Sequence, residues 1–198
     1  MEFTKNALEI NQELFGERHP YTAMSYNNVG LEYGNLGNFE EALEFGKKAL
    51  EIRKELLGEK HPDTAQSFDD VGFEYGNLGD YENAVEFKIK ALEIRKELLG
   101  NSHPDTITSY NNVGYEYTAL GMSDKGIEYR LKALAIASEI GNKQLSATLI
   151  NRVARSYLAA GDIARAKEYY EKASKIFKEN GMEEDYNNNL EELKKING

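Results

Sequence analysis

The stretch SYNNVGLEYGNLG, residues Ser25–Gly37, decides the fold because the chain repeats it. It returns as SFDDVGFEYGNLG at Ser67–Gly79 and as SYNNVGYEYTALG at Ser109–Gly121, with an offset of 42 residues each time. A looser copy, LINRVARSYLAAG at Leu149–Gly161, follows after 40 residues. Such a period is typical of a solenoid, in which each repeat is one supersecondary unit and neighbouring units share a core. We therefore expect the function to lie on the repeated surface.

Each repeat is predicted to be a helix–turn–helix. Proline just inside a helix start and glycine just past a helix end is the expected asymmetry, and Pro62 and Gly37 follow it. Asn38 and Asp80 can cap the second helices, and Asn38 with Glu41 has the spacing of a capping box. No stretch of the sequence shows the two-residue alternation of a strand.

The apolar residues of the repeats predict which faces of the helices are buried. On the first helices they recur with i, i+3, i+4, i+7 spacing, and the glycine of this stripe allows a close helix approach. The stripe comprises Tyr26, Val29, Gly30 and Tyr33, then Phe68, Val71, Gly72 and Tyr75, then Tyr110, Val113, Gly114 and Tyr117. The packing face of the first complete second helix comprises Phe39, Ala42, Leu43, Phe45, Ala49, Leu50 and Ile52.

This pattern resembles the tetratricopeptide repeat (TPR), whose consensus is W-x2-L-G-x2-Y…A-x3-F…P. Tyr26-x2-Val29-Gly30-x2-Tyr33 and the later Ala42 fall in that register. The 42-residue period and the LG-x2-HPDT linker are similar to the TPRs of kinesin light chains, and the resemblance covers residues 1–181. It implies an all-α solenoid, a right-handed superhelix of antiparallel helix pairs with a C-terminal capping helix.

The chain departs from the family pattern at one core position. The large residue expected four positions after the conserved alanine is Gly46, Lys88 and Arg130 in successive repeats, and it returns only at Tyr170. In addition, Gly126 replaces the conserved alanine of the third repeat. We expect the turn of that repeat, which also contains the sequence MS, to be the loosest.

The repeat register also predicts the organisation of the chain, as one domain. Residues 1–18 form the second helix of a truncated repeat, residues 19–60, 61–102, 103–143 and 144–181 form four repeats, and residues 182–198 form the capping helix. The first helix should then have an uncovered apolar face. Either the chain is a segment of a longer array, or that face packs on something else. Self-association through Phe3, Leu8 and Phe15 is one such alternative.

Composition excludes several classes of protein. The 198 residues are 40% apolar without any run long enough to span a membrane, and the start of the chain lacks the apolar region of a signal peptide. The absence of cysteine excludes disulfides and thiol catalysis and fits a cytoplasmic location. The net charge of −10 argues against nucleic-acid binding. However, residues 143–181 have eight Lys/Arg against four Asp/Glu, a charge of +4, so the remainder carries −14. This is either scattered surface charge or a bipolar surface that orients a partner.

Neither an enzyme nor a metal or cofactor site is expected. His19, His61 and His103 stand at equivalent points of successive repeats, roughly 10 Å or more apart if stacked helices carry them. Since zinc ligands lie at about 2.0–2.1 Å from the ion, the three cannot share one metal, and we expect them to cap or pack. The sequence also lacks a Walker loop, a dinucleotide-binding loop and a nucleophile motif.

The TPR resemblance implies that the remaining first-helix positions line a concave groove. An amide offers donors and an acceptor to an extended peptide backbone, and Phe73 and Tyr115 would add apolar anchors. Alternatively, the asparagines bond between neighbouring first helices and only brace the array. The predicted groove residues are Asn27, Asn28, Leu31, Asp69, Asp70, Phe73, Asn77, Asn111, Asn112, Tyr115, Arg152 and Arg155.

The expected function is a non-catalytic scaffold module that binds a protein or peptide. The carboxylate clamp of chaperone-tail receptors is matched only at Asn112 and Arg152, so that specialisation is not expected. An acidic group could bind near Arg152 and Arg155, whereas Asp69 and Asp70 would prefer a basic stretch. Two alternatives stay open: a self-associating structural segment, and a sensor arm that regulates an attached domain.

Overall fold

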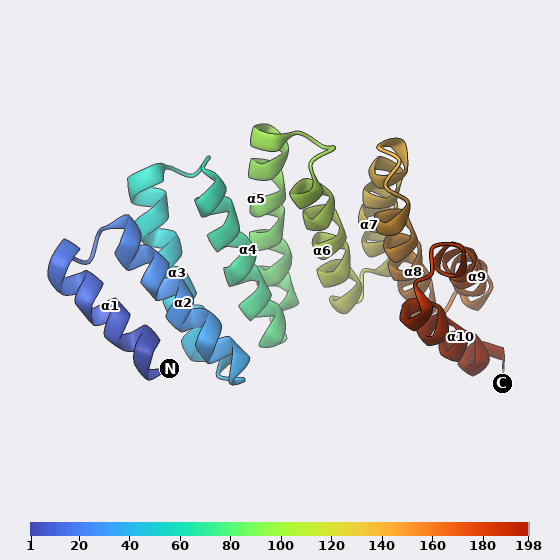
Figure 1. Cartoon of the computed structure of the whole chain (residues 1–198), viewed down its shortest axis with the longest axis horizontal. Coiled ribbons are helices and arrows are strands. Elements are labelled where there is room, and N and C mark those ends of the chain that lie inside the picture. Colours follow the sequence, from blue (N-terminus) through green and yellow to red (C-terminus); the bar gives the residue numbers. More distant parts are fainter. Residues whose placement is uncertain (198) are drawn as a thin grey trace. The chain divides into compact units, whose positions relative to one another are not determined.

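The computed structural model describes residues 1–197, and within this range the chain forms ten α-helices and no strand (Figure 1). The predicted all-α fold is therefore confirmed. The helices are α1 (Glu2–Phe15), α2 (Pro20–Asn35), α3 (Phe39–Leu57), α4 (Pro62–Asn77), α5 (Tyr81–Leu99), α6 (Pro104–Ala119), α7 (Ser123–Glu139), α8 (Lys143–Ala159), α9 (Ile163–Glu179) and α10 (Glu183–Asn197). They belong to two compact units: the N-terminal half, Met1–Gly100, and the C-terminal half, which starts at Asn101.

In the N-terminal half, α1 to α5 lie side by side in chain order (Figure 1). The stripe predicted on the first helices forms the core, because Tyr26 and Val29 of α2 pack with Ala49 and Ile52 of α3. Tyr33 is half-buried and stacks on the ring of Phe45, with 5.5 Å between ring centroids. The stripe of α4 packs against α5 in the same way.

The glycines of the stripe allow close helix approach, as predicted. A Cβ on Gly30 would lie 3.2 Å from the carbonyl oxygen of Ala42. A Cβ on Gly72 would lie 3.2 Å from the carbonyl oxygen of Ala84 and 2.9 Å from Cγ of Lys88. A side chain on the first helix would thus collide with the backbone of the second.

The C-terminal half repeats this arrangement from α6 to α9 and is completed by α10. Tyr157 of α8 and the fully buried Tyr170 of α9 form its core. Leu193 and Ile196 of α10 pack against this cluster, and the amide of Asn189 donates to the backbone carbonyl of Tyr170 at 3.3 Å. The last helix therefore covers the apolar end of this half, as expected of a capping helix.

The helix starts confirm the predicted role of the histidines but not that of Asn38. Nδ1 of each histidine accepts from the backbone N–H two residues later, at 3.1–3.2 Å. Asp80 caps α5 through a bond from the N–H of Asn83. Asn38 makes no such bond to α3, so the predicted capping box is wrong. Asn38 is exposed, and water can satisfy the free N–H groups there.

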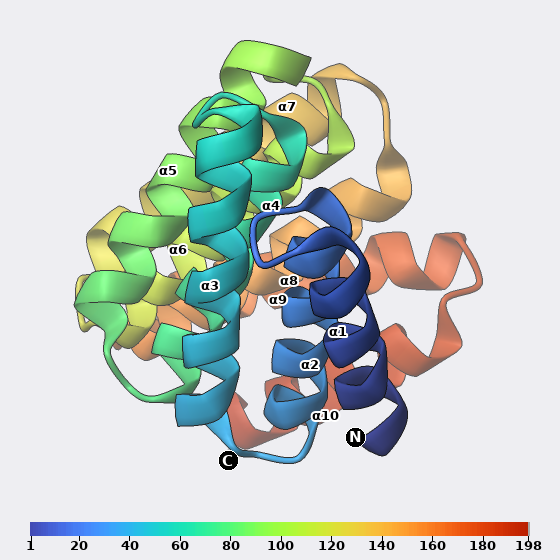
Figure 2. The same cartoon turned by 90° about the vertical axis from the view of Figure 1, so that its left-hand side faces the viewer.

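One face of α1 is not covered within the N-terminal half. Phe3, Ile10 and Leu14 are exposed, and Phe3 keeps 90% of its surface accessible. Figure 2 shows α1 beside α2, with its far side turned away from the other helices of this half. Leu8, by contrast, is buried in the core against α2 and α3, so its predicted role in self-association is wrong. Among residues 1–197, no helix combines the length and apolar character of a membrane span.

Candidate binding surface on the first helices

The predicted groove positions carry three exposed apolar side chains at equivalent points of three repeats. Leu31 of α2, Phe73 of α4 and Tyr115 of α6 are 48%, 54% and 57% exposed. Burial costs little entropy for rigid aromatic side chains, so exposed rings at equivalent repeat positions are suitable anchors for a partner. In each half they lie next to polar residues of the same helices.

On the first helix of each of the four repeats, two adjacent polar residues have different environments. These pairs are Asn27–Asn28, Asp69–Asp70, Asn111–Asn112 and Asn151–Arg152. Among the second members, Asn28 and Arg152 are exposed, whereas Asp70 and Asn112 are half-buried. The first members point toward the protein and are buried or half-buried; they are Asn27, Asp69, Asn111 and Asn151. The sequence predicted both members as ligand contacts, but the first members mainly face their own half.

In the N-terminal half, Asp69 already has two cationic partners. Nζ of Lys88 lies 3.4 Å from Oδ1, and the guanidinium of Arg95 lies 3.2 Å from Oδ2. Arg95 also donates to the side-chain oxygen of Gln66 at 2.8 Å. Both cations are on α5 and are almost fully buried, although Lys88 also approaches the ring of Phe73 at 5.7 Å. The carboxylate of Asp69 is thus occupied by its own half and is a poor binding site for a basic stretch.

Two further acids of α4 are held in environments that disfavour their charge. Burial raises the pKa of Asp70, while the amide of Gln66, which donates at 2.8 Å, acts in the opposite direction. Burial also raises the pKa of Glu74, which accepts from the amide of Asn77 at 3.1 Å. Asn77 was predicted to contact a ligand, and in the structure its amide bonds to Glu74. The three acids of α4 therefore each bond to side chains of their own half.

In the C-terminal half, the buried cation is Arg130 of α7. It is 5% exposed, and one terminal nitrogen donates to the backbone carbonyl of Arg152 at 2.8 Å and to the hydroxyl of Ser156 at 2.5 Å. Burial, followed by the neighbouring charge of Arg152, lowers the pKa of Arg130 to about 10. The guanidinium is therefore charged at neutral pH, and it lies 5.9 Å from the ring centre of Tyr115.

Asn111 is not an exposed groove residue, which corrects its predicted role. It is 4% exposed and donates through Nδ2 to Oδ1 of Asn112 at 3.2 Å. Its own Oδ1 has no hydrogen-bond partner within the described residues. Arg152 and Arg155 of α8 are exposed as predicted. Asn112, Tyr115, Arg152 and Arg155 are therefore the accessible members of the predicted set in this half.

The sequence did not predict that Lys88, Arg95 and Arg130 of the second helices lie against residues of the first helices. Lys88 and Arg130 occupy the position where the repeat pattern calls for a large side chain, and a charge at a core position was the available signal. Their long aliphatic stems fill that space next to the stripe glycines, while their buried charged ends lie near the rings of Phe73 and Tyr115 on the first helices. Arg95 gave no signal, because its position is not marked by the repeat pattern.

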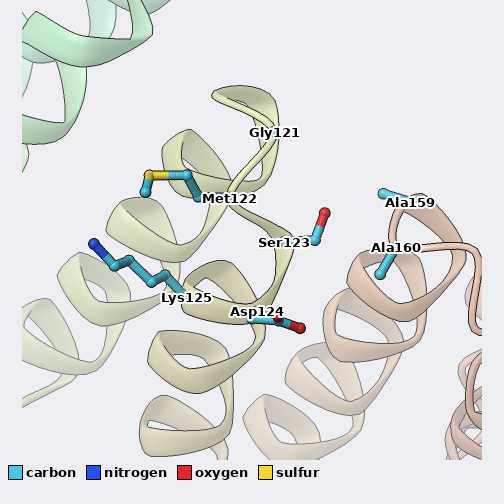
Figure 3. A pocket seen from close by; sticks show the side chains of 7 residues that line it. All are labelled: Gly121, Met122, Ser123, Asp124, Lys125, Ala159 and Ala160. Atoms are coloured by element: carbon cyan, nitrogen blue, oxygen red, sulfur yellow. The ribbon is translucent and has the colours of Figure 1, made fainter.

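A surface hollow in the C-terminal half is a weaker candidate for a binding site than the first-helix surface. It lies between the turn at Gly121–Lys125 and the end of α8 (Figure 3). In Figure 3 the side chains of Met122 and Lys125 point away from Ala159 and Ala160 on the other side. The side chains of Ser123 and Asp124 point toward that side, so the polar side chains that face the hollow come from one turn. In the described part of the chain, no group of three or more histidine and acidic side chains is arranged to hold a metal ion.

Comparison with family models identifies the repeats. A tetratricopeptide repeat model matches residues 22–63, and a second one matches residues 71–125 and 116–179. The chain belongs to the tetratricopeptide repeat family. TPR proteins are in general scaffolds for protein interactions. A comparison with curated protein sequences gives no match.

Solved TPR structures share the fold of this TPR protein. A variant of a Podosopora anserina kinesin light chain with nearly identical TPR-like repeats has a TM-score of 0.85 at 22% identity, covering 91% of this chain and 86% of its own. BtubC (BKLC) from P. vanneervenii has a TM-score of 0.79 at 24% identity, covering 88% and 70%. A Rap protein complexed with competence and sporulation factor has a TM-score of 0.70 at 19% identity, covering 98% of this chain and 52% of its own. The predicted similarity to kinesin-light-chain-type repeats is thus confirmed at the level of the fold.

Proposed function

We propose that this TPR protein binds an extended segment of a partner protein along its first helices, without catalysis. The observation that carries the proposal is that the same first-helix position of three repeats holds an exposed apolar side chain, Leu31, Phe73 or Tyr115, each with polar residues just before it. Exposed apolar anchors with nearby groups that can bond to a peptide backbone suit an extended peptide. The helix pairs are packed before binding, so little conformational entropy is lost by the protein itself.

The test uses peptides, because no partner is identified. A library of random peptides displayed on phage is selected on the immobilised full chain, and the enriched peptides are synthesised with a fluorescent label. We expect Phe73→Ala or Tyr115→Ala to weaken binding of such a peptide about tenfold or more, as removal of a central anchor does. Leu98→Ala on α5 is the matched control, since Leu98 is exposed to a similar degree on a second helix. Enrichment of no peptide, or binding that both anchor variants retain, contradicts the proposal.

A second candidate function, self-association, is favoured by the uncovered face of α1. Phe3, Ile10 and Leu14 form an exposed apolar surface on one helix. Such a surface is a common site of contact with another protein, and the candidate partner is a second copy of the chain. Leu8 does not take part, because it is buried within the N-terminal half.

A further inference from the structure

The buried cation of the second helix has a carboxylate partner in the N-terminal half but none in the C-terminal half, and this difference indicates a site for a ligand. In the N-terminal half, the buried cation Lys88 faces the carboxylate of Asp69, which also contacts Arg95. Shifted by 42 residues, these three positions are Arg130, Asn111 and Ala137 in the C-terminal half. The cation is kept there, but the carboxylate has become a neutral amide.

Arg130 is consequently a buried charge without a carboxylate. Among residues 1–197 it has no ion pair, and its Nε has no hydrogen-bond partner. It donates only to neutral groups, the carbonyl of Arg152 and the hydroxyl of Ser156. Buried charges are normally paired because an uncompensated charge in a protein interior is costly. A group held in this state is prepared to accept an anion.

Two more arginines add to the positive charge beside Arg130. Arg152 and Arg155 of α8 are exposed residues, although burial lowers the pKa of Arg152 and the charge of Arg155 acts on the buried Tyr170, and neither forms an ion pair within the described residues. Both lie close enough to lower the pKa of Arg130. The three guanidinium groups therefore repel one another, and an anion placed among them would relieve this repulsion.

Neutral groups at the same place complete the arrangement. The ring of Tyr115 lies 5.9 Å from the Arg130 guanidinium. The amide of Asn112 accepts from Asn111 through its oxygen, which leaves its own N–H groups available to an anionic oxygen. Guanidinium groups and neutral hydrogen-bond donors thus lie together on this surface, and this combination suits the binding of carboxylate and phosphate groups.

We propose that Arg130, Arg152 and Arg155 form an anion-binding site that receives a carboxylate or phosphate group of a bound peptide, in the role that Asp69 has beside Lys88. This inference rests on the proposed peptide-binding function and assigns it a ligand chemistry. It also assigns position 111 a role in specificity, because asparagine there keeps the site open to an external anion. An aspartate there would close the site from within.

The first experiment follows the arginine Nε–H signals of the full chain by NMR during titration. The probes are a hexaglutamate peptide, a hexaglutamine peptide, a peptide with one phosphoserine among alanines, and inorganic phosphate. We expect the Arg130 signal to shift with the glutamate or the phosphoserine peptide and to stay in place with the glutamine peptide. The two anionic peptides distinguish a carboxylate from a phosphate ligand, and inorganic phosphate shows whether the group binds without its chain.

The second experiment closes the site by substitution. Asn111→Asp supplies an internal carboxylate, and we expect it to weaken binding of the anionic peptide about tenfold or more. The double variant Arg152→Ala/Arg155→Ala changes only exposed residues and should weaken binding similarly without loss of folding. Asn38→Asp is the matched control: it makes the same change of charge at an exposed position before α3, outside the predicted binding surface, and should leave affinity unchanged.

The outcomes separate this inference from the proposed function. If no anion shifts the Arg130 signal, or if Asn111→Asp binds the anionic peptide as the wild type does, the anion site is refuted. Selected peptides that still depend on Phe73 and Tyr115 would in that case leave the peptide-binding function standing. Conversely, anion binding at Arg130 with no dependence on those two anchors would support the site and refute the proposed mode of binding.

Discussion

At the scale of single residues, charged side chains occupy core positions where the repeat pattern has a large side chain. The same position holds Gly46, Lys88, Arg130 and Tyr170, and all four are buried. The sequence indicated the departure but not its consequence, because the partner of a buried charge is set by which side chains face it across the helix pair. Asp69 contacts two cations, whereas the equivalent residue of the next repeat, Asn111, is a neutral amide and cannot neutralise a charge.

Asp69→Asn tests the importance of the buried carboxylate for stability. It removes the group that both Lys88 and Arg95 contact, so we expect the free energy of unfolding to fall by about 3 kcal/mol, as when one partner of a buried ion pair is removed. Urea denaturation at pH 7 measures the change. Asp70→Asn is the matched control on the adjacent residue and should cost much less, because burial already disfavours the charge of Asp70. Equal losses in both variants would contradict the distinction.

Glu74 should give the chain a specific dependence on pH. Burial raises its pKa above the ordinary value of 4.5, so the folded state holds this proton more tightly than the unfolded state. Its contribution to stability is therefore present below pH 4.5 and is lost as the pH rises through the raised pKa. Relative to the wild type, Glu74→Gln should gain stability between pH 4 and pH 8. Urea denaturation of both proteins across this range checks the sign, and a difference that does not vary with pH would contradict the raised pKa.

At the scale of the helices, the sequence was highly informative because the repetition supplies several copies of each signal. Three near-identical stripes at helical spacing predicted the buried faces of α2, α4 and α6, and the histidine–proline pairs predicted their starts. The cap of α3 was mispredicted because spacing alone does not determine whether Asn38 bonds to the helix or to water. The inward position of Asn111 was missed for a similar reason, since adjacent helix positions differ in direction by 100° and the register was assigned by family resemblance alone.

Gly114→Ala tests the close contact between the two helices of a repeat. An added Cβ would lie 2.7 Å from Cγ of Arg130 and 2.8 Å from the carbonyl oxygen of Gly126. We expect a loss of about 2 kcal/mol from this overlap, despite the better helix propensity of alanine. Gly46→Ala is the control inside α3: its Cβ would lie 3.4 Å from Val71, an ordinary contact. It should gain about 0.5–1 kcal/mol. Thermal or urea unfolding measures both, and a stabilised Gly114→Ala variant would contradict the packing argument.

At the scale of the whole molecule, the repeat period predicted a solenoid, and the resemblance of the repeats to the TPR consensus predicted an all-α TPR protein. They did not indicate the separation into two compact units at Gly100, because the repeat period continues across that point without interruption. The overall charge of −10 was also a poor guide to the binding surface. Local arginines on α7 and α8 create a positive region within an acidic chain, and a ligand responds to the local field.

The uncovered face of α1 gives a prediction for the assembly state of the full chain. The double variant Phe3→Glu/Leu14→Glu places two charges on side chains that are 90% and 69% exposed, so it should fold as stably as the wild type. If this face associates with a second copy, sedimentation velocity between about 1 and about 100 µM should show the wild type converting to dimer by mass action, while the variant stays monomeric. Leu98→Glu on α5 is the control for a charge on an exposed leucine and should still dimerise. A wild type that sediments as a monomer throughout, or a dimer that survives both charges on α1, would exclude this face as the contact, because glutamates cannot be buried there without a compensating partner.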